Sequence, residues 1–401
     1  KEVADVWFDS GAMPFAQYAD ERKLNADTKK LESFEDLWQR TPYPADFISE
    51  AIDQTRGWFY TLLSVGVLME RGTPYKNVIC LGHLLDKDGK KMSKSIGNVV
   101  EPWEQMDKYG VDVIRLWMYS VNQPGEGKNY DEKIILELSR KVFALLDNCY
   151  VFFDQYGNDL KTKDLQLKTS PHVLDQWIIS LLHKMIIEGT SAMERYDLFT
   201  ASRMIRDFVN DFSTWYIRRS RDRFKSDDIE DKMNTLETTR YVFLELSKYM
   251  APFTPFYADD LYQKVGGEKA NLDTRRDARS SEAGFRESVH LETWNTEHTT
   301  WDTQILSDME MVRDIVTKGL EARQKSGIKV RQPLGKLKVK SEKLKEEYLE
   351  ILKDELNLKE IVEDVSLETN VELDAEITPE LKMEGDFREL ARAIQDMRKT
   401  S

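Results

Sequence analysis

The 401-residue chain carries 58 lysines and arginines against 72 aspartates and glutamates, a formal net charge of −14 at pH 7. This acidic balance excludes a protein that coats nucleic acid through bulk positive charge, so any such contact must come from a local basic cluster. The two cysteines, Cys80 and Cys149, exclude a disulfide framework and a cysteine-rich zinc site and suit a reducing cytosol. The length predicts two or three domains, and no stretch is long and apolar enough to span a membrane.

The first 70 residues predict two short strands, Val3–Phe8 and Ala45–Ser49. Apolar residues recur at helical spacing over Trp58–Leu68, which predicts a helix after the second strand. Ligands of open α/β sheets bind where strands end, so polar residues at this crossover are candidate site residues. They are Glu50, Asp53 and Gln54. An equal alternative for Asp53 is that it is only the N-cap of the helix.

A basic loop, Leu85–Val100, follows the apolar run Asn77–Leu81, which is typical of a buried strand. After a turn it carries three lysines and two serines around one methionine: Lys90, Lys91, Met92, Ser93, Lys94 and Ser95. Lysines are mobile point charges, and hydroxyls and amides make directional hydrogen bonds, so such a loop suits a polyphosphate. The alternative is an ordinary solvated turn, because short lysine-rich motifs give false matches.

Three motifs resemble signatures of the class I aminoacyl-tRNA synthetases. Lys91-Met92-Ser93-Lys94-Ser95 resembles the loop that closes over the triphosphate of ATP while the aminoacyl-adenylate forms. Trp7-Phe8-Asp9-Ser10-Gly11 resembles the segment just after the editing insertion of the isoleucyl, valyl and leucyl enzymes. Asp53–Phe59, which reads Asp-Gln-Thr-Arg-Gly-Trp-Phe, resembles the isoleucyl branch and departs from the valyl and leucyl patterns. The resemblance implies that the protein uses ATP and Mg²⁺ and that its amino acid is isoleucine.

The resemblance also implies a role for each candidate residue. Lys91 and Lys94 would be the catalytic residues. The ATP site would consist of Asp53, near the ribose, and of Lys91, Met92, Ser93, Lys94 and Ser95. The amino-acid site would consist of Trp7, Glu50, Gln54 and Trp58, with the two indoles walling the side-chain pocket. Ala51 departs from the glycine that is common in the family, which puts a close backbone approach to the adenylate in doubt at this position.

A helix-rich region follows the basic loop. Residues 103–109 and 111–116 predict two helices, residues 131–153 predict a third, and residues 157–170 predict a linker. Aromatic and aliphatic residues then recur at helical spacing over residues 171–255, which is typical of the core of a helix bundle. The order of this region resembles the anticodon-binding domain of the isoleucyl and valyl enzymes.

A second basic cluster lies within this bundle. Its five cations are Arg218, Arg219, Arg221, Arg223 and Lys225. On a helix, residues 218, 221 and 225 would share one face. A solvated face is the ordinary interpretation, but in a chain of net charge −14 this local density predicts contact with tRNA phosphates.

The last hundred residues predict a small α+β domain. A long helix is expected over 301–324, and a strand over 327–339, where apolar residues alternate with basic ones. Two further helices are expected over 344–358 and 386–399. Upstream of this domain, residues 265–287 predict a loop.

The predicted architecture is multidomain. An α/β part, the second half of a Rossmann-type catalytic domain, precedes an all-α anticodon-binding helix bundle and the small α+β domain. The expected boundaries are 1–125 for the catalytic half, 126–170 for a stem-contact connector, 171–300 for the anticodon-binding domain and 301–401 for the C-terminal domain. Since the chain opens with Lys1 rather than methionine, we expect it to be a piece of a longer protein.

The function that the resemblance implies is ATP-dependent activation of isoleucine and its transfer to tRNA-Ile. The family's first signature, His-x-Gly-His, is not among these residues, so the isolated chain is expected to be inactive. A valyl synthetase is one alternative, against which residues 53–58 argue. A tRNA-binding module that never activates an amino acid is the other. We expect a cytoplasmic monomer with no membrane partner.

Overall fold

The computed structural model describes residues 5–18, 30, 32–157, 170–266, 287–294, 296, 300–341 and 344–400. The predicted linker over 157–170 and the predicted loop over 265–287 lie almost entirely outside these ranges. The chain divides into two compact units, which are described separately. The first comprises Lys1–Asp164, Met185–Arg219 and Phe243–Thr296, and the second comprises Leu165–Lys184, Ser220–Val242 and Glu297–Ser401. Within the described ranges, every helix is too short or too polar to cross a membrane.

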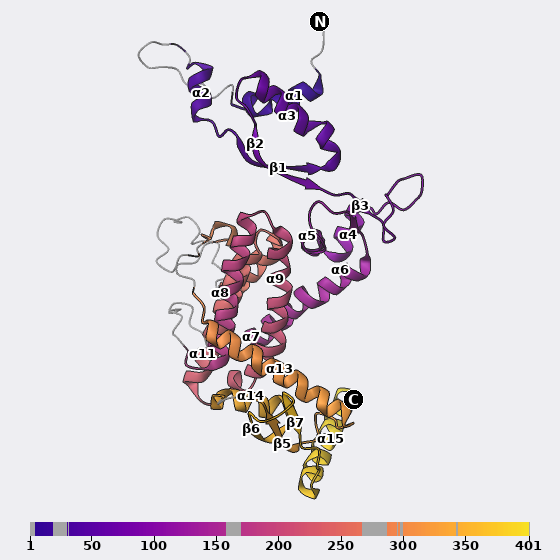
Figure 1. Cartoon of the computed structure of the whole chain (residues 1–401), viewed down its shortest axis with the longest axis vertical. Coiled ribbons are helices and arrows are strands. Elements are labelled where there is room, and N and C mark those ends of the chain that lie inside the picture. The colour runs from indigo at the N-terminus through magenta and orange to yellow at the C-terminus, as the bar shows by residue number, and fades with distance from the viewer. Residues whose placement is uncertain are drawn as a thin grey trace. The chain divides into compact units, whose positions relative to one another are not determined.

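The first unit contains a strand–helix–strand arrangement near its start (Figure 1). Its elements are β1 (Ala45–Ala51), η2 (Ile52–Arg56), α3 (Trp58–Leu68) and β2 (Tyr75–Leu81). The two strands are parallel, and Ile48, Phe59 and Leu62 form a core between the sheet and α3. Glu50 pairs with Cys80 where the strands end. The predicted strand and helix are therefore confirmed here, and the crossover lies at the carboxyl end of the sheet.

Residues Val6–Ala16 form helix α1, so the predicted strand over Val3–Phe8 is wrong. Asp5 is the N-cap, and its carboxylate accepts the backbone N–H of Trp7 at 2.7 Å. This bond satisfies one of the amides that a helix start leaves unpaired. The helix packs on α3 (Figure 1), and a Cβ on Gly11 would lie 2.7 Å from a backbone oxygen of α3. The cap and the packing override the strand propensity of valine and phenylalanine.

The remainder of the first unit is mainly helical. Its further elements are α2 (Phe34–Arg40), β3 (Leu84–Leu85), α4 (Pro102–Tyr109), α5 (Val111–Ser120), β4 (Lys128–Asn129), α6 (Glu132–Leu138), η3 (Ser139–Phe143), α7 (Ala144–Gly157), α9 (Leu198–Asp211), η4 (Phe212–Ile217), α10 (Arg218–Ser220), α12 (Pro255–Gly266) and η6 (Val289–Leu291). Helices α8 (Val173–Glu194) and α11 (Ile229–Met250) contribute residues to both units, and the last residue of α10, Ser220, belongs to the second unit. The helices predicted over 103–109, 111–116 and 131–153 are confirmed. Phe208, Phe212 and Tyr216 are buried and stacked in succession, as a bundle core requires.

The second unit ends in a three-stranded sheet with helices. Its elements after α11 are α13 (Thr303–Lys325), β5 (Leu334–Val339), α14 (Glu346–Leu356), β6 (Leu358–Glu363), β7 (Val371–Leu373) and α15 (Pro379–Thr400). The strand order is β6–β5–β7, with β5 parallel to β6 and antiparallel to β7. Leu334, Leu337 and Val339 are buried, as the alternating pattern predicts.

Strand β5 begins at Leu334 rather than at the predicted residue 327 because a buried arginine holds the preceding backbone as a loop. Arg323 is 1% exposed. Its guanidinium donates to the carbonyl oxygens of Lys329 and Gln332 at 3.1 and 3.0 Å. Pro333 also lacks the N–H that a strand interior requires. The basic residues of this stretch therefore lie partly on a loop.

Candidate functional site

The basic loop lies between β3 and α4 in the first unit. Leu85 and Lys91 form an isolated antiparallel bridge, and the N–H of Asp86 donates to the carbonyl oxygen of Lys90 at 2.9 Å. Gly89 completes this tight turn with a φ of +77°, a left-handed conformation that glycine adopts without steric cost. The turn reverses the chain immediately before the lysine–serine motif.

The motif itself forms a second turn at the surface. The side chains of Lys91 and Lys94 are exposed. The hydroxyl oxygens of Ser93 and Ser95 lie 2.9 Å apart, and Ser93 Oγ also accepts the N–H of Ile96 at 3.3 Å. The loop thus offers two ammonium groups and two hydroxyl groups to solvent, a donor set that suits a polyphosphate.

The end of β1 and the crossover that follows it carry the other candidate residues. Glu50 and Asp53 are exposed. The amide of Gln54 donates to Asp53 Oδ2 at 3.0 Å and accepts the backbone N–H of Trp58 at 3.0 Å. Gln54 rather than Asp53 therefore satisfies an amide at the start of α3, whose N-cap position is Gly57. The alternative that Asp53 is the N-cap of α3 is wrong.

The ring of Trp7 and the side-chain oxygen of Gln54 lie close to Gly57, the residue before Trp58. A Cβ on this glycine would lie 2.9 Å from the ring of Trp7 and 2.7 Å from Gln54 Oε1. The indole N–H of Trp58 donates to the carbonyl oxygen of Ser10 at 3.2 Å, which ties α3 to α1. Trp7 is 48% exposed, whereas Trp58 is half-buried. Three of the four residues predicted for the amino-acid site therefore lie together.

The structure does not connect these two groups directly. In the described part of the chain, no hydrogen bond or ion pair joins the basic loop to the crossover residues. Their shared feature is position, since both follow strands of the first unit. The predicted site residues thus form two separate groups of side chains, and Asp53, predicted for the ATP site, lies in the crossover group beside Gln54.

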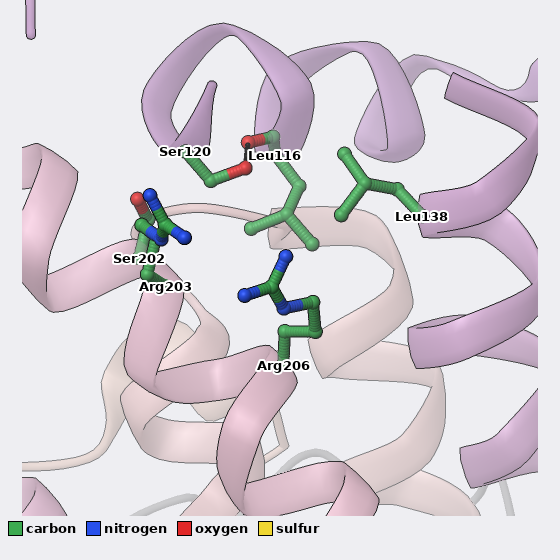
Figure 2. Close-up of a pocket in the computed structure, with 6 residues that line it drawn as sticks. All are labelled: Leu116, Ser120, Leu138, Ser202, Arg203 and Arg206. Carbon is green, nitrogen blue, oxygen red and sulfur yellow. Dashed lines mark hydrogen bonds between the residues drawn. The ribbon is translucent and has the colours of Figure 1, made fainter. Parts of the chain in front are cut away.

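Two hollows in the first unit lie away from these residues. The first, between α5, α6 and α9, has a volume of about 10 Å³, which suits roughly one water molecule (Figure 2). Its lining residues are Leu116, Ser120, Leu138, Ser202, Arg203 and Arg206. The second has a volume of about 210 Å³ and is lined in part by Lys248, His290 and Trp294. Neither hollow is lined by a predicted site residue.

The second basic cluster does not lie on one helix, contrary to the sequence pattern. The helical run that starts at Leu198 ends at Ser220, and Arg223–Lys225 forms a separate short turn, η5. Residues 218, 221 and 225 therefore do not share one helical face. Arg218 and Arg219 belong to the first unit, whereas Arg221, Arg223 and Lys225 belong to the second.

Arg223 is an anchor within the second unit. Its side chain is 11% exposed and donates to both carboxylate oxygens of the fully buried Asp175, each at 2.8 Å. It also donates to Asp231 at 2.7 Å, and Ser170 donates to Asp175 at 2.6 Å. The guanidinium therefore neutralises a buried carboxylate instead of facing solvent as the prediction assumes. Asp175 is 48 residues away in the sequence, so no local pattern signals this pairing.

Two residues that shape the basic loop, Asp86 and Asn98, are not among the predicted site residues. The carboxylate of Asp86 accepts backbone N–H groups inside the turn, and its pKa is lowered mainly by the hydrogen bond from the Asn98 amide. An aspartate followed three residues later by glycine is a signal for the turn. The bond to Asn98 spans 12 residues and has no such local signal.

Comparison with known families finds two matches in this chain. Residues 1–131 match the class I tRNA synthetases (I, L, M and V). Residues 175–341 match the anticodon-binding domain of tRNA ligases. The first range is therefore similar to the class I tRNA synthetases, and the second is similar to a tRNA-ligase anticodon-binding domain.

The similar curated proteins named below are all isoleucine--tRNA ligases. The ligase of Dehalococcoides mccartyi strain 195 is 36% identical over the whole chain, which covers 40% of that ligase. The ligase of Clostridium tetani is 36% identical over the whole chain, which covers 36% of it. The ligase of Deinococcus radiodurans is 38% identical over 90% of the chain, which covers 32% of it. The chain thus spans about two fifths or less of these relatives.

A solved structure shares the fold. A LeuRS of Agrobacterium radiobacter K84, in a ternary complex with tRNA and LeuAMS, superposes with a TM-score of 0.50. The superposition covers 75% of this chain and 33% of the LeuRS chain, at 17% sequence identity. The likeness supports the predicted class of fold, an α/β region together with a helical region.

Proposed function

We propose that this chain is part of a ligase that activates isoleucine with ATP and transfers it to tRNA-Ile. The observation that carries the proposal is its similarity, over its whole length, to proteins named isoleucine--tRNA ligase. The side chains of the basic loop and those around Gly57 are chemically consistent with this proposal. In such a reaction the protein acts mostly by positioning the reactants and stabilising phosphate charge.

The basic loop would bind the triphosphate. Lys91 and Lys94 would stabilise the charge that develops on it, and Ser93 and Ser95 would donate hydrogen bonds. Asp53 would bind the ribose. Among the described residues no cluster of histidine, cysteine and carboxylate ligands suits a metal ion. Mg²⁺ would therefore be held chiefly by the ATP phosphates, as is usual for this ion.

The group around Gly57 would bind isoleucine. Trp7 and Trp58 would enclose the branched side chain, and Glu50 and Gln54 would contact the polar end of the amino acid. The indole of Trp58 is oriented by its bond to α1, which supports a wall of fixed shape. A pocket of this kind selects by size and cannot accept polar or larger residues without cost.

The cations Arg218, Arg219, Arg221 and Lys225 would contact tRNA phosphates. Arg218, Arg221 and Lys225 are exposed, whereas Arg219 is half-buried. Cations near a polyanion add affinity that falls with salt concentration. Arg223 would contribute indirectly, because its ion pairs with Asp175 and Asp231 hold the start of η5. The second candidate function, tRNA binding without amino-acid activation, is favoured by the match of residues 175–341 to an anticodon-binding domain, which would bind tRNA whether or not an amino acid is activated.

Aminoacylation of a tRNA-Ile transcript by the full-length protein that contains this chain tests the proposal. We expect labelled isoleucine to be esterified to the tRNA in the presence of ATP and Mg²⁺, with valine a much poorer substrate. Preferential charging of a tRNA-Val transcript with valine would establish the valyl alternative. Binding of tRNA with no charging by any amino acid would establish the binding module.

A further inference from the structure

Two side chains fix the backbone of the basic loop from opposite ends. Asp86 precedes the motif, and its Oδ1 accepts the N–H groups of Asp88 and Lys90 at 3.0 and 2.8 Å. Its second oxygen, Oδ2, accepts the Nδ2 amide of Asn98 at 2.8 Å, across 12 residues of chain. A carboxylate that accepts three hydrogen bonds is a strong, directional anchor.

Asn98 continues this connection into the motif itself. Its Oδ1 accepts the N–H of Ser93 at 2.9 Å, and its Nδ2 also donates to the carbonyl oxygen of Lys91 at 3.2 Å. The backbone on both sides of Met92 is thus held by a single amide. Asp86 and Asn98 are half-buried, whereas the lysines that they position are exposed.

We propose that Asp86 and Asn98 form a clamp that preorganises Lys91–Ser95 to receive the triphosphate of ATP. The inference rests on the proposed function and deepens it by assigning two positioning residues. Neither side chain touches the nucleotide in this account. Both act through the backbone, so that the ammonium and hydroxyl groups keep fixed positions relative to one another while the loop closes over the phosphates. Such preorganisation lowers the barrier because the loop does not have to reorder internally during the reaction step.

In the clamp Asn98 is the hydrogen-bond donor and Asp86 is the acceptor. The proposal can therefore be tested by swapping the two residues. In Asp86→Asn, the new amide NH₂ would face the NH₂ of Asn98. Rotating Asn98 to relieve this contact would set its NH₂ against the N–H of Ser93 and its oxygen against the carbonyl of Lys91. In Asn98→Asp, two carboxylates would face each other. Both single variants therefore break the clamp.

The double variant Asp86→Asn, Asn98→Asp restores it with the roles reversed. The amide at position 86 would donate to the carboxylate at position 98, and the other oxygen of that carboxylate would accept the N–H of Ser93. The bond to the carbonyl of Lys91 is lost, and a carboxylate oxygen lies against that carbonyl instead, so the restoration is partial. The net charge is unchanged. Asp88→Asn is the matched control, because it makes the same charge change in the same turn on an exposed side chain.

The first measurement is isoleucine-dependent ATP–pyrophosphate exchange by the full-length protein. We expect each single variant to lower kcat/KM for ATP by about tenfold or more, with KM for isoleucine unchanged, because a lost positioning contact acts on the triphosphate end. The double variant should recover part of the loss and be clearly better than either single variant, and the control should stay within about twofold of wild type. An equal effect on ATP and isoleucine, or a double variant as poor as the singles, would overturn the proposal.

The second measurement does not depend on activity. Amide hydrogen exchange at Lys90 and Ser93 should speed up by about tenfold or more in the single variants and return toward the wild-type rate in the double variant. Unchanged exchange in the singles would overturn the clamp. If wild type shows this hydrogen-exchange protection but catalyses no ATP–pyrophosphate exchange with any amino acid, the proposed function fails, and with it the positioning role.

Discussion

Replacing Arg223 separates its structural role from a role in RNA binding. In Arg223→Gln, Asp175 would keep its hydrogen bond from Ser170 but lose the guanidinium that contacts both of its oxygens. Removing one partner of a buried ion pair costs about 3–5 kcal/mol. Asp231 is 31% exposed and would be hydrated, so we place the loss near the low end, about 3 kcal/mol. This free energy corresponds to a roughly hundredfold change in the folded-to-unfolded ratio.

Amide hydrogen exchange over the second unit measures this loss directly. We expect protection at residues 173–176 and at the start of α11 to fall by about a hundredfold if opening is subglobal. The salt slope of tRNA binding should be unchanged, because Arg223 makes no phosphate contact in this account. Arg221→Gln is the matched control, an exposed arginine of the same segment whose loss should lower stability by no more than about 1 kcal/mol. Native protection together with a reduced salt slope in Arg223→Gln would refute the reasoning.

Three further predictions concern the two sites and the pH response. In the full-length protein, Lys94→Ala should slow adenylate formation far more than it weakens isoleucine binding; presteady-state kinetics measures both, and no change in rate would remove Lys94 from the active site. Trp58→Ala should relax rejection of larger aliphatic amino acids in competition assays, by about tenfold to a hundredfold, and unchanged rejection would place the indole in the core. Burial, followed by the charge of Arg223, lowers the pKa of His172, whose ring accepts the N–H of Leu174 at 3.2 Å. The neutral ring is thus favoured in the fold, so its stabilisation is complete above the ordinary pKa of about 6.5 and declines as the pH falls below it. Urea denaturation of wild type and His172→Gln at pH 7.5 and 5 should show the larger loss in wild type, and equal losses would contradict this assignment.

Local sequence signals predict much of the catalytic half. The strand before Glu50 and the helix after Trp58 follow from hydrophobic spacing, and the lysine–serine motif lies on an exposed turn as its composition indicates. Trp7 is the exception, because one N-cap bond from Asp5 and contact with α3 turn an apparent strand into a helix. Packing between elements distant in sequence is invisible to local propensity.

The second basic cluster shows the same limit for charged residues. Charge density alone cannot distinguish a cation that faces solvent from one that pairs with a distant buried carboxylate, as Arg223 does with Asp175. The clamp in the basic loop is a further case, since the partners Asp86 and Asn98 are separated by a turn and by the motif itself. Spacing predicts which residues share a helix face only when the helix continues, and here it ends at Ser220.

Isoleucine-dependent ATP–pyrophosphate exchange tests the central claim most directly, namely that this chain carries the triphosphate-binding and amino-acid-binding residues of an isoleucine-activating enzyme. We expect the full-length protein to exchange pyrophosphate with isoleucine far faster than with valine or leucine. The isolated 401-residue chain should not, because the His-x-Gly-His signature is not among its residues. Rapid exchange by the isolated chain would contradict the divided site, and no isoleucine-dependent exchange by the full-length protein would contradict the proposed activity.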